Sequence, residues 1–246
     1  MADHTYDHAD KIESGSYDTR SDRLERARTA GGHIDDRSQI PLPEIHRSLA
    51  NPTPLGLLSF ATGIFLISLM GVHSRGIQTP NVVYAVVSMF PGISQIIAGI
   101  MSFVSGNTFG ATVFPSYAAF NLSFALINFP GTGIIASYTD PITGELSPDF
   151  PQAIAMYMWT WFVISGIFMV AALRSTWMIM AMFFFLEIEY ILLASGYMLG
   201  NGSLLVAGNS IGFVVAFCAF WAGCSGFWVK GITPFTLPAF PIVKED

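Results

Sequence analysis

Two acidic residues, Glu187 and Glu189, stand in the middle of an otherwise apolar run of the sequence. An ionised side chain near the centre of a bilayer costs roughly 2.5–3.5 kcal/mol on insertion scales, so such residues usually face protein or water. At about 100° per residue in a helix, Glu189 shares the direction of Leu186 and Tyr190, whereas Glu187 points more to the side. Both are candidates for proton coupling, because a neutral carboxyl can donate a hydrogen bond or a proton. Structural hydrogen bonding between helices or protomers is the alternative interpretation.

The sequence holds no arrangement of residues typical of an enzyme. His73 lies at a helix end, the other four histidines lie in a polar N-terminal segment, and no nucleotide-binding motif is present. Cys218 and Cys224 share one apolar run, and two ligands alone do not make a zinc site. We therefore expect no catalysis, no cofactor and no metal, and we interpret the cysteines as packing residues.

The stretch Asn-Pro-Thr-Pro-Leu-Gly-Leu at 51–57 has the form of a helix start. Asparagine is a favoured N-cap, and proline is tolerated in the first helical turn. The free N–H groups and the positive dipole end of such a start suit an anion. An ordinary helix start explains the same residues, so anion binding is one of two interpretations.

Composition places the elements that carry these residues in a membrane. Hydrophobic residues make up 52% of the chain, charged residues 11%, and the mean hydropathy is +0.53. Soluble domains carry about 25% charged residues. Seventeen of the charged residues lie before residue 48, which leaves eleven for the rest. The net charge of −6 therefore reflects largely the N-terminal segment, and no basic stripe predicts binding to nucleic acid.

Six apolar segments follow, each near the roughly 20 residues that span the hydrocarbon of a bilayer. Backbone groups must bond to one another in lipid, so spans of this length should be helices. The predicted fold is therefore an all-α membrane protein with six transmembrane helices per protomer. The expected spans are 54–72, 81–104, 111–129, 153–173, 176–199 and 203–229.

The spans divide the chain into a membrane domain and two tails. Residues 1–46 have too few apolar residues to offset conformational entropy, so we expect a disordered cytoplasmic tail there. The transmembrane domain is expected at 47–231 and a cytoplasmic C-terminal tail at 232–246. With the N-terminus inside, only Arg75 lies outside, and the loop at 130–152 carries acids but no Lys or Arg. Basic residues near the membrane favour the cytoplasm, which is therefore the side predicted for both termini and for Arg47, Arg174, Lys230 and Lys244.

Small residues and prolines occur within the predicted spans. Gly208 and Gly212 form a Gly-x-x-x-Gly step, which is typical of close helix packing within or between protomers. Pro91 and Pro115 fall inside the second and third spans. Each removes a backbone hydrogen bond and predicts a kink.

Two motifs, in this order, resemble those of the acetate uptake transporter family, which includes bacterial acetate–succinate permeases and fungal acetate/ammonia transport proteins. The first is the stretch 51–60, which ends in Ser-Phe, and the second is the stretch 106–117, which opens with Gly-Asn-Thr-Phe-Gly and ends with Ser-Tyr. The likeness continues at 92–99 and covers residues 51–230. The long polar N-terminal segment is similar to the fungal branch.

The resemblance implies a homohexamer in which each protomer carries its own pathway for acetate and related short carboxylates across the plasma membrane. It also implies a hydrophobic constriction midway, formed by Phe60, Tyr117 and Leu186; the first two positions follow from the motifs and the third from spacing. Such a narrowing can also gate by dewetting. The polar side chains expected to replace hydration water at the ends of the path are Asn51, Gln95, Asn107, Thr108 and Asn121.

One departure from the bacterial relatives concerns the positions just after Leu186, which are uncharged in those proteins and hold Glu187 and Glu189 here. An ionised carboxyl would repel a carboxylate, whereas a neutral one could donate a hydrogen bond or a proton. We therefore predict a transporter or channel for acetate and related carboxylates, with or without a coupled proton. Two alternatives stay open: export of ammonia or ammonium, and an acetic-acid sensor that transports nothing.

Overall fold

The structure, a computed structural model, describes residues 49–242, and this part of the chain is built from helices. The predicted tail at 1–46 lies outside the described residues, as do Arg47 and Lys244.

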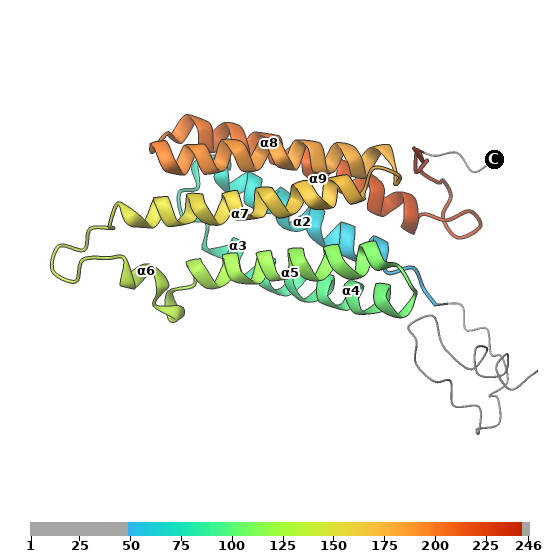
Figure 1. Cartoon of the computed structure of the whole chain (residues 1–246), viewed down its shortest axis with the longest axis horizontal. Coiled ribbons are helices and arrows are strands. Elements are labelled where there is room, and N and C mark those ends of the chain that lie inside the picture. Colours follow the sequence, from blue (N-terminus) through green and yellow to red (C-terminus); the bar gives the residue numbers. More distant parts are fainter. Residues whose placement is uncertain (1–48, 243–246) are drawn as a thin grey trace, which may run out of the picture. The chain divides into compact units, whose positions relative to one another are not determined.

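Six stretches of helix are long and apolar enough to cross a membrane, as predicted, and Figure 1 shows them side by side. The second stretch is divided into two α-helices by a wide π-type turn at Ser88–Ile93, and a short helix, α6 (Ile134–Ser137), lies in the long loop after the third. The long helices are α2 (Thr53–Gly71), α3 (Asn81–Val87), α4 (Ser94–Val104), α5 (Thr108–Asn128), α7 (Asp149–Ala171), α8 (Trp177–Leu199) and α9 (Gly202–Phe227).

Two helices begin three or four residues earlier than the sequence predicts. Helix α5 begins at Thr108 rather than near Ala111, because the Asn107 side chain caps it and accepts a hydrogen bond from the Gly110 N–H at 3.0 Å. Helix α7 begins at Asp149, which places the proline two residues later in the first turn, where the lost N–H donor has no helical partner.

Glycine and proline pairs bring neighbouring helices together. A Cβ added at Gly99 would meet the ring of Pro115, and one added at Gly63 would lie 2.8 Å from the ring of Pro91. The wide turn at 88–93 contains Pro91, so the second span is irregular there, whereas α5 continues through Pro115 as one helix.

The Gly-x-x-x-Gly step of α9 packs inside the protomer. A Cβ at position 208 would lie 2.9 Å from the Leu193 side chain of α8, and one at position 212 would meet Ser68 of α2. The small residues of α9 thus allow α2 and α8 to approach it on two sides.

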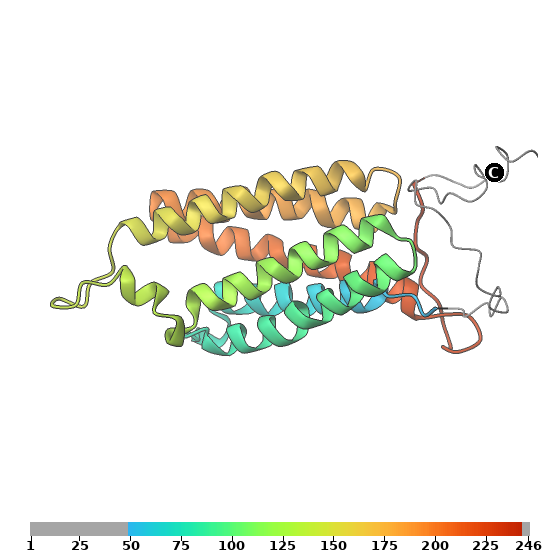
Figure 2. The same cartoon turned by 60° about the horizontal axis from the view of Figure 1, so that its bottom comes forward.

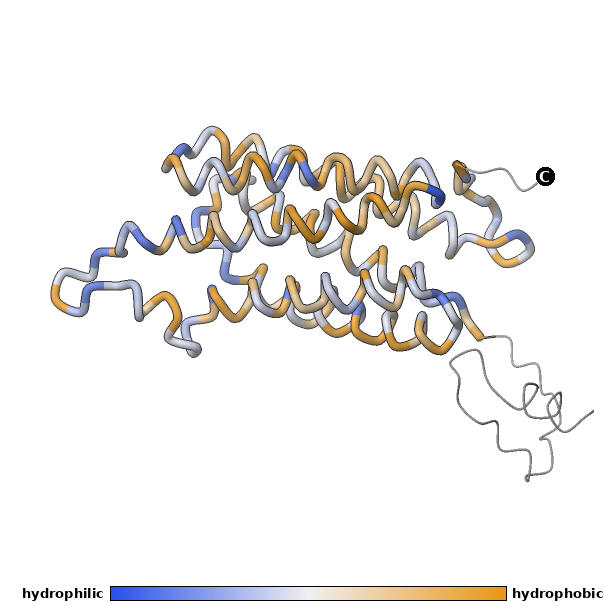
Figure 3. The backbone as a smooth tube through the Cα atoms, viewed as in Figure 1, coloured by the Kyte–Doolittle hydropathy of each residue, from blue (hydrophilic) through white to orange (hydrophobic). Residues whose placement is uncertain are grey.

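The long helices form two neighbouring groups. Helix α9 packs on α2 and α8, α8 also packs on α7, and α4 packs on α5. Figure 2 shows α4 and α5 running together beside the helices of the other group. Hydrophilic residues gather at the helix ends and in the loops, while α8 carries a hydrophilic stretch in its middle (Figure 3). The helices of both groups that face each other form the candidate site.

Candidate functional site

Three side chains from three helices form an apolar layer in the protein interior. Phe60 of α2, Tyr117 of α5 and Leu186 of α8 are each no more than 7% exposed. The ring centroids of Phe60 and Tyr117 lie 5.4 Å apart, and Leu186 lines the same narrow cavity as Phe60. The structure therefore brings together the three residues that the sequence analysis assigned to a constriction, which we call the constriction layer.

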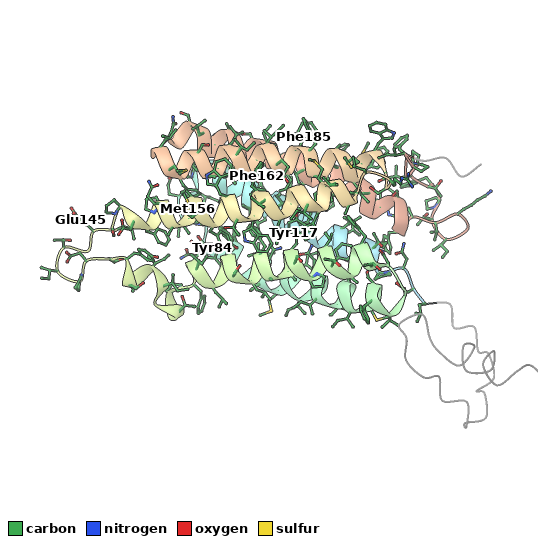
Figure 4. All side chains as sticks on the ribbon, in the orientation of Figure 1. Tyr84, Tyr117, Glu145, Met156, Phe162 and Phe185 are labelled. Atoms are coloured by element: carbon green, nitrogen blue, oxygen red, sulfur yellow. The ribbon has the colours of Figure 1, made fainter. Side chains whose placement is uncertain are left out.

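Tyr117 is the centre of this layer. Its ring lies 5.8 Å from that of Phe168 on α7 and 6.4 Å from that of Phe183 on α8, centroid to centroid. Figure 4 shows Tyr117 between α5 and α7, about midway along the helices. Its hydroxyl forms a 2.6 Å hydrogen bond with the hydroxyl of Ser165 on α7. The ring thus packs against three other helices, while the polar end of the side chain is satisfied on α7.

Space leads to the constriction layer from the end of the molecule that carries His73. A vestibule of about 280 Å³ at this end, the His73-side vestibule, adjoins a narrow cavity of about 70 Å³ that reaches Phe60 and Leu186. The two spaces share lining residues, namely Ile67, Phe124, Tyr197 and Asn209. A cavity of that size can hold a few water molecules or one small solute.

A second vestibule, of about 370 Å³, opens at the opposite ends of the same helices. Arg174 and Asn107 lie at its mouth, and Leu57 and Phe183 lie at its deep end; we call it the Arg174-side vestibule. Its described lining residues differ from all those of the narrow cavity. Leu57 is one helical turn before Phe60 on α2, so the constriction layer lies between the two spaces and separates them.

Two amides of the predicted polar set lie behind the narrow cavity. Asn121, which lines the cavity, donates hydrogen bonds to the backbone oxygen of Tyr117 at 2.7 Å and to Oε1 of Gln95 at 3.3 Å. Both amide side chains are buried, so this pair joins α5 to α4 and fixes the orientation of Asn121. The bond to the Tyr117 oxygen couples the amide to the constriction layer.

The other predicted polar residues lie near the helix ends where the Arg174-side vestibule opens, and one of them lines it. Asn107 lines this vestibule, and its Oδ1 caps α5. Asn51 is exposed and accepts a hydrogen bond from the Thr53 N–H at 3.1 Å, as a helix cap does. Thr108 is exposed and lies outside the lining of the described cavities.

The two acidic residues of α8 point to different surroundings. Glu189 lines the narrow cavity, and its Oε1 lies 2.9 Å from where a Cβ of Gly212 would be, close to Ser68. Glu187 lies toward Gly166 of α7, with its Oε1 3.8 Å from the corresponding position. Both carboxyls are buried, and among the described residues the Oε2 atom of Glu189 and both oxygens of Glu187 lack a hydrogen-bond partner. Glu189 is therefore the acid that borders the path.

Three residues of this site were not predicted from the sequence: Ser165, Ser68 and Asn209. A lone serine or asparagine among many small residues of apolar helices carries no signal of its own. Ser165 stands one helical turn after Trp161 on α7, and only the approach of α5 gives that position a partner.

The model of the GPR1/FUN34/yaaH family matches residues 36–244 of this chain. The chain belongs to this family. The family resemblance inferred from the two motifs is confirmed.

Several relatives within the GPR1/FUN34/yaaH family carry names that refer to transport. Ammonia transport outward protein 2 of Saccharomyces cerevisiae is 34% identical, covering 81% of this chain and 70% of that protein. Acetate permease A of Emericella nidulans is 32% identical, covering 78% of this chain and 66% of that protein. Succinate-acetate/proton symporter SatP of Escherichia coli is 30% identical, covering 68% of this chain and 82% of that protein.

The solved structure of the bacterial acetate channel SatP has a similar fold. The TM-score is 0.64 at 28% identity, and the match covers 73% of this chain and 92% of that one. Together with the six apolar helices, these relatives identify a multi-pass membrane protein of a family of transporters and channels.

Proposed function

We propose that this protein passes acetate and related short carboxylates across a membrane through the path between α2, α5, α7 and α8. The observation that carries this proposal is the constriction layer of Phe60, Tyr117 and Leu186 between two vestibules. An apolar narrowing favours small, partly apolar solutes over larger or strongly hydrated ones. The names of the acetate permease and the acetate channel among the relatives support this substrate class.

The polar residues of the path have the proposed role of replacing hydration water around the solute. Both N–H groups of the Asn121 amide are bonded, to Gln95 and to the Tyr117 backbone oxygen, so Asn121 can present its amide oxygen to a solute in the narrow cavity. Asn107 does the same in the Arg174-side vestibule. Asn51 and Thr108 would meet the solute only at the surface.

Glu189 is the proposed proton carrier of the path. A neutral carboxyl at the wall of the narrow cavity can donate a hydrogen bond to a passing carboxylate, whereas an ionised one repels it. Binding of a proton and passage of the anion are then coupled by electrostatics. Glu187, at the seam of α7 and α8, is the second candidate, with a structural role as its alternative.

Passage of ammonium or ammonia is the second candidate function, and one observation favours it. The narrow cavity that holds the Glu189 carboxyl is also lined by aromatic residues, namely Phe60, Phe120, Phe124, Tyr190 and Tyr197. Carboxylates and aromatic faces both attract small cations. Relatives named for ammonia transport agree with it.

The remaining features of the proposal concern assembly and location. We propose a homohexamer in the plasma membrane with one path per protomer, a role in transport rather than catalysis or sensing, and both tails, 1–46 and 232–246, in the cytoplasm. Arg174 and Lys230 lie at the end of the bundle where α2 begins, and Arg75 lies at the other end. This distribution supports the orientation, because basic residues are enriched on the cytoplasmic side.

Flux measurements on purified protein in lipid vesicles test the proposal. Uptake of labelled acetate, succinate and methylammonium is measured across an imposed pH gradient. We expect acetate uptake above that of empty vesicles, and slower uptake of succinate. Acetate uptake equal to that of empty vesicles refutes the proposal, and methylammonium uptake under the same conditions then supports the second candidate.

A further inference from the structure

Helices α5 and α7 are joined by two hydroxyl pairs that mirror each other. Tyr117 of α5 bonds Ser165 of α7 at 2.6 Å, and Ser123 of α5 bonds Tyr157 of α7 at 2.8 Å. In each pair a tyrosine of one helix meets a serine of the other. Because the helices run in opposite directions, the first pair lies at the constriction layer and the second lies nearer the His73 end.

The two tyrosines differ in how firmly their hydroxyls are held. The Tyr157 hydroxyl also donates to the backbone oxygen of Phe120 at 3.1 Å, so it keeps an acceptor if the serine is removed. For the Tyr117 hydroxyl, the described part of the chain offers one bond, that to Ser165, which is fully buried. A buried hydroxyl that loses its partner carries the desolvation cost of an unsatisfied group. Loss of the serine therefore favours a movement of the Tyr117 side chain, whereas Tyr157 keeps its bond to the Phe120 oxygen.

The rings around Tyr117 fix its position less firmly than its hydroxyl does. The rings of Phe60, Phe168 and Phe183 contact it tilted or edge-on, and that of Trp161 is stacked on it, at centroid distances of 5.4 to 6.4 Å. Such aromatic contacts are satisfied over a range of distances and angles. A hydrogen bond of 2.6 Å is far more demanding, because it weakens steeply with distance and angle.

We propose that Ser165 is a positioning residue for solute selection. Its hydroxyl fixes the Tyr117 phenol to α7, and the width of the constriction layer therefore depends on the Tyr117–Ser165 bond. The inference rests on the proposed passage of carboxylates, and it adds that the size limit is set by a serine outside the layer itself.

The test compares variants that remove the bond from either side. Ser165→Ala and Tyr117→Phe each remove it, and Tyr117→Phe does so without vacating ring volume. Ser123→Ala is the matched control, since it removes the same kind of serine–tyrosine bond from the same interface between α5 and α7. Ser165→Thr keeps the hydroxyl and serves as the conservative variant.

The first measurement is the ratio of acetate flux to butyrate flux in lipid vesicles. We expect this ratio to fall several-fold in Ser165→Ala and in Tyr117→Phe, to fall no further in the double variant, and to stay near the unmodified value in Ser123→Ala and Ser165→Thr. An unchanged ratio in Ser165→Ala, an equal fall in Ser123→Ala, or additive effects in the double variant would overturn the inference.

The second measurement needs no flux. Fluorotyrosine is incorporated throughout the chain, and the fluorine resonance of Tyr117 is assigned by its loss in Tyr117→Phe. In detergent, Ser165→Ala should shift or narrow that resonance while Ser123→Ala leaves it in place. If the unmodified protein passes no carboxylate while Ser165→Ala still shifts the Tyr117 resonance, the proposed function is refuted and the coupling of Tyr117 to Ser165 is retained. If folded Ser165→Ala shows no shift, the coupling itself is refuted.

Discussion

The ring centroids of Phe60 and Tyr117 lie 5.4 Å apart with their planes inclined by 50°, so that α2 and α5 are in contact in the constriction layer. Each residue is the last of its sequence motif, Phe60 of the stretch 51–60 and Tyr117 of the stretch 106–117. Their contact lies between the narrow cavity and the Arg174-side vestibule, which share no described lining residue.

Shortening Phe60 should widen the constriction layer. We expect Phe60→Ala to raise succinate or butyrate flux relative to acetate flux several-fold, because the lost ring leaves a gap beside Tyr117. Phe65→Ala is the control, since Phe65 lies on the same helix and is 41% exposed. Equal flux ratios in the two variants would contradict the assignment. Phe60→Leu supplies a milder change if the alanine variant unfolds, since Phe→Ala in a core costs about 3–5 kcal/mol.

Replacing Glu189 should change how transport responds to pH. We expect Glu189→Gln to flatten the pH dependence of acetate uptake, because glutamine keeps the shape and hydrogen bonding but cannot release a proton. Glu187→Gln should leave the profile closer to that of the unmodified protein, since Glu187 lies away from the narrow cavity. Uptake measured at matched acetic acid gradients between pH 5 and 8 separates the two. An unaltered profile in Glu189→Gln would make Glu189 a structural residue.

Asn121 should contribute to passage through its amide. We expect Asn121→Ala to reduce acetate flux several-fold, because it removes two hydrogen bonds and the amide that borders the narrow cavity. Asn128→Ala, on the same helix, removes one bond to the Phe124 oxygen in the wider vestibule and should have less effect. A larger loss in Asn128→Ala would reverse the assignment.

Gly212 should tolerate no side chain. A Cβ there meets Ser68 and lies 2.9 Å from Glu189 Oε1, so Gly212→Ala should lower the thermal unfolding temperature in detergent by several degrees. At Gly166 the neighbouring Glu187 oxygen is 3.8 Å away, and alanine is the better helix former. Gly166→Ala should therefore leave the unfolding temperature unchanged or raise it. Partial recovery in Ser68→Ala/Gly212→Ala would identify the clash, and no recovery would place it elsewhere.

The loop before α7 should loosen in acid. Backbone N–H groups of Ile142 and Thr143 donate to the Asp140 carboxylate at 2.7 and 3.1 Å and hold its pKa below its usual range. The stabilisation is present above the pKa of the unfolded segment and is lost as pH falls through the lower folded value. Hydrogen exchange at the Ile142 and Thr143 amides, corrected for intrinsic rates, should speed up there. Asp140→Ala should show that faster exchange at neutral pH; equal protection in both proteins would refute the role of the carboxylate.

Much of this protein follows from the sequence, because length and apolarity act locally. Each span can be recognised from its own residues, since a bilayer requires about 20 of them in a helix. The family resemblance of the two motifs predicted Phe60 and Tyr117, and spacing along the fourth and fifth spans predicted Leu186. The predicted helix boundaries were less accurate where a side chain sets the start of the helix. Asn107 is an example, because its cap makes α5 begin three residues before the predicted start.

Only the tertiary structure decided which of these residues share a space. Glu187 and Glu189 stand two residues apart, yet one faces α7 and the other borders the narrow cavity beside Gly212. The serine that holds Tyr117 lies 48 residues further along the chain, in a helix whose sequence marks no polar role for it. The physical reason is that a partner across a helix seam is fixed by how two helices pack, and packing depends on every small residue between them rather than on any local pattern.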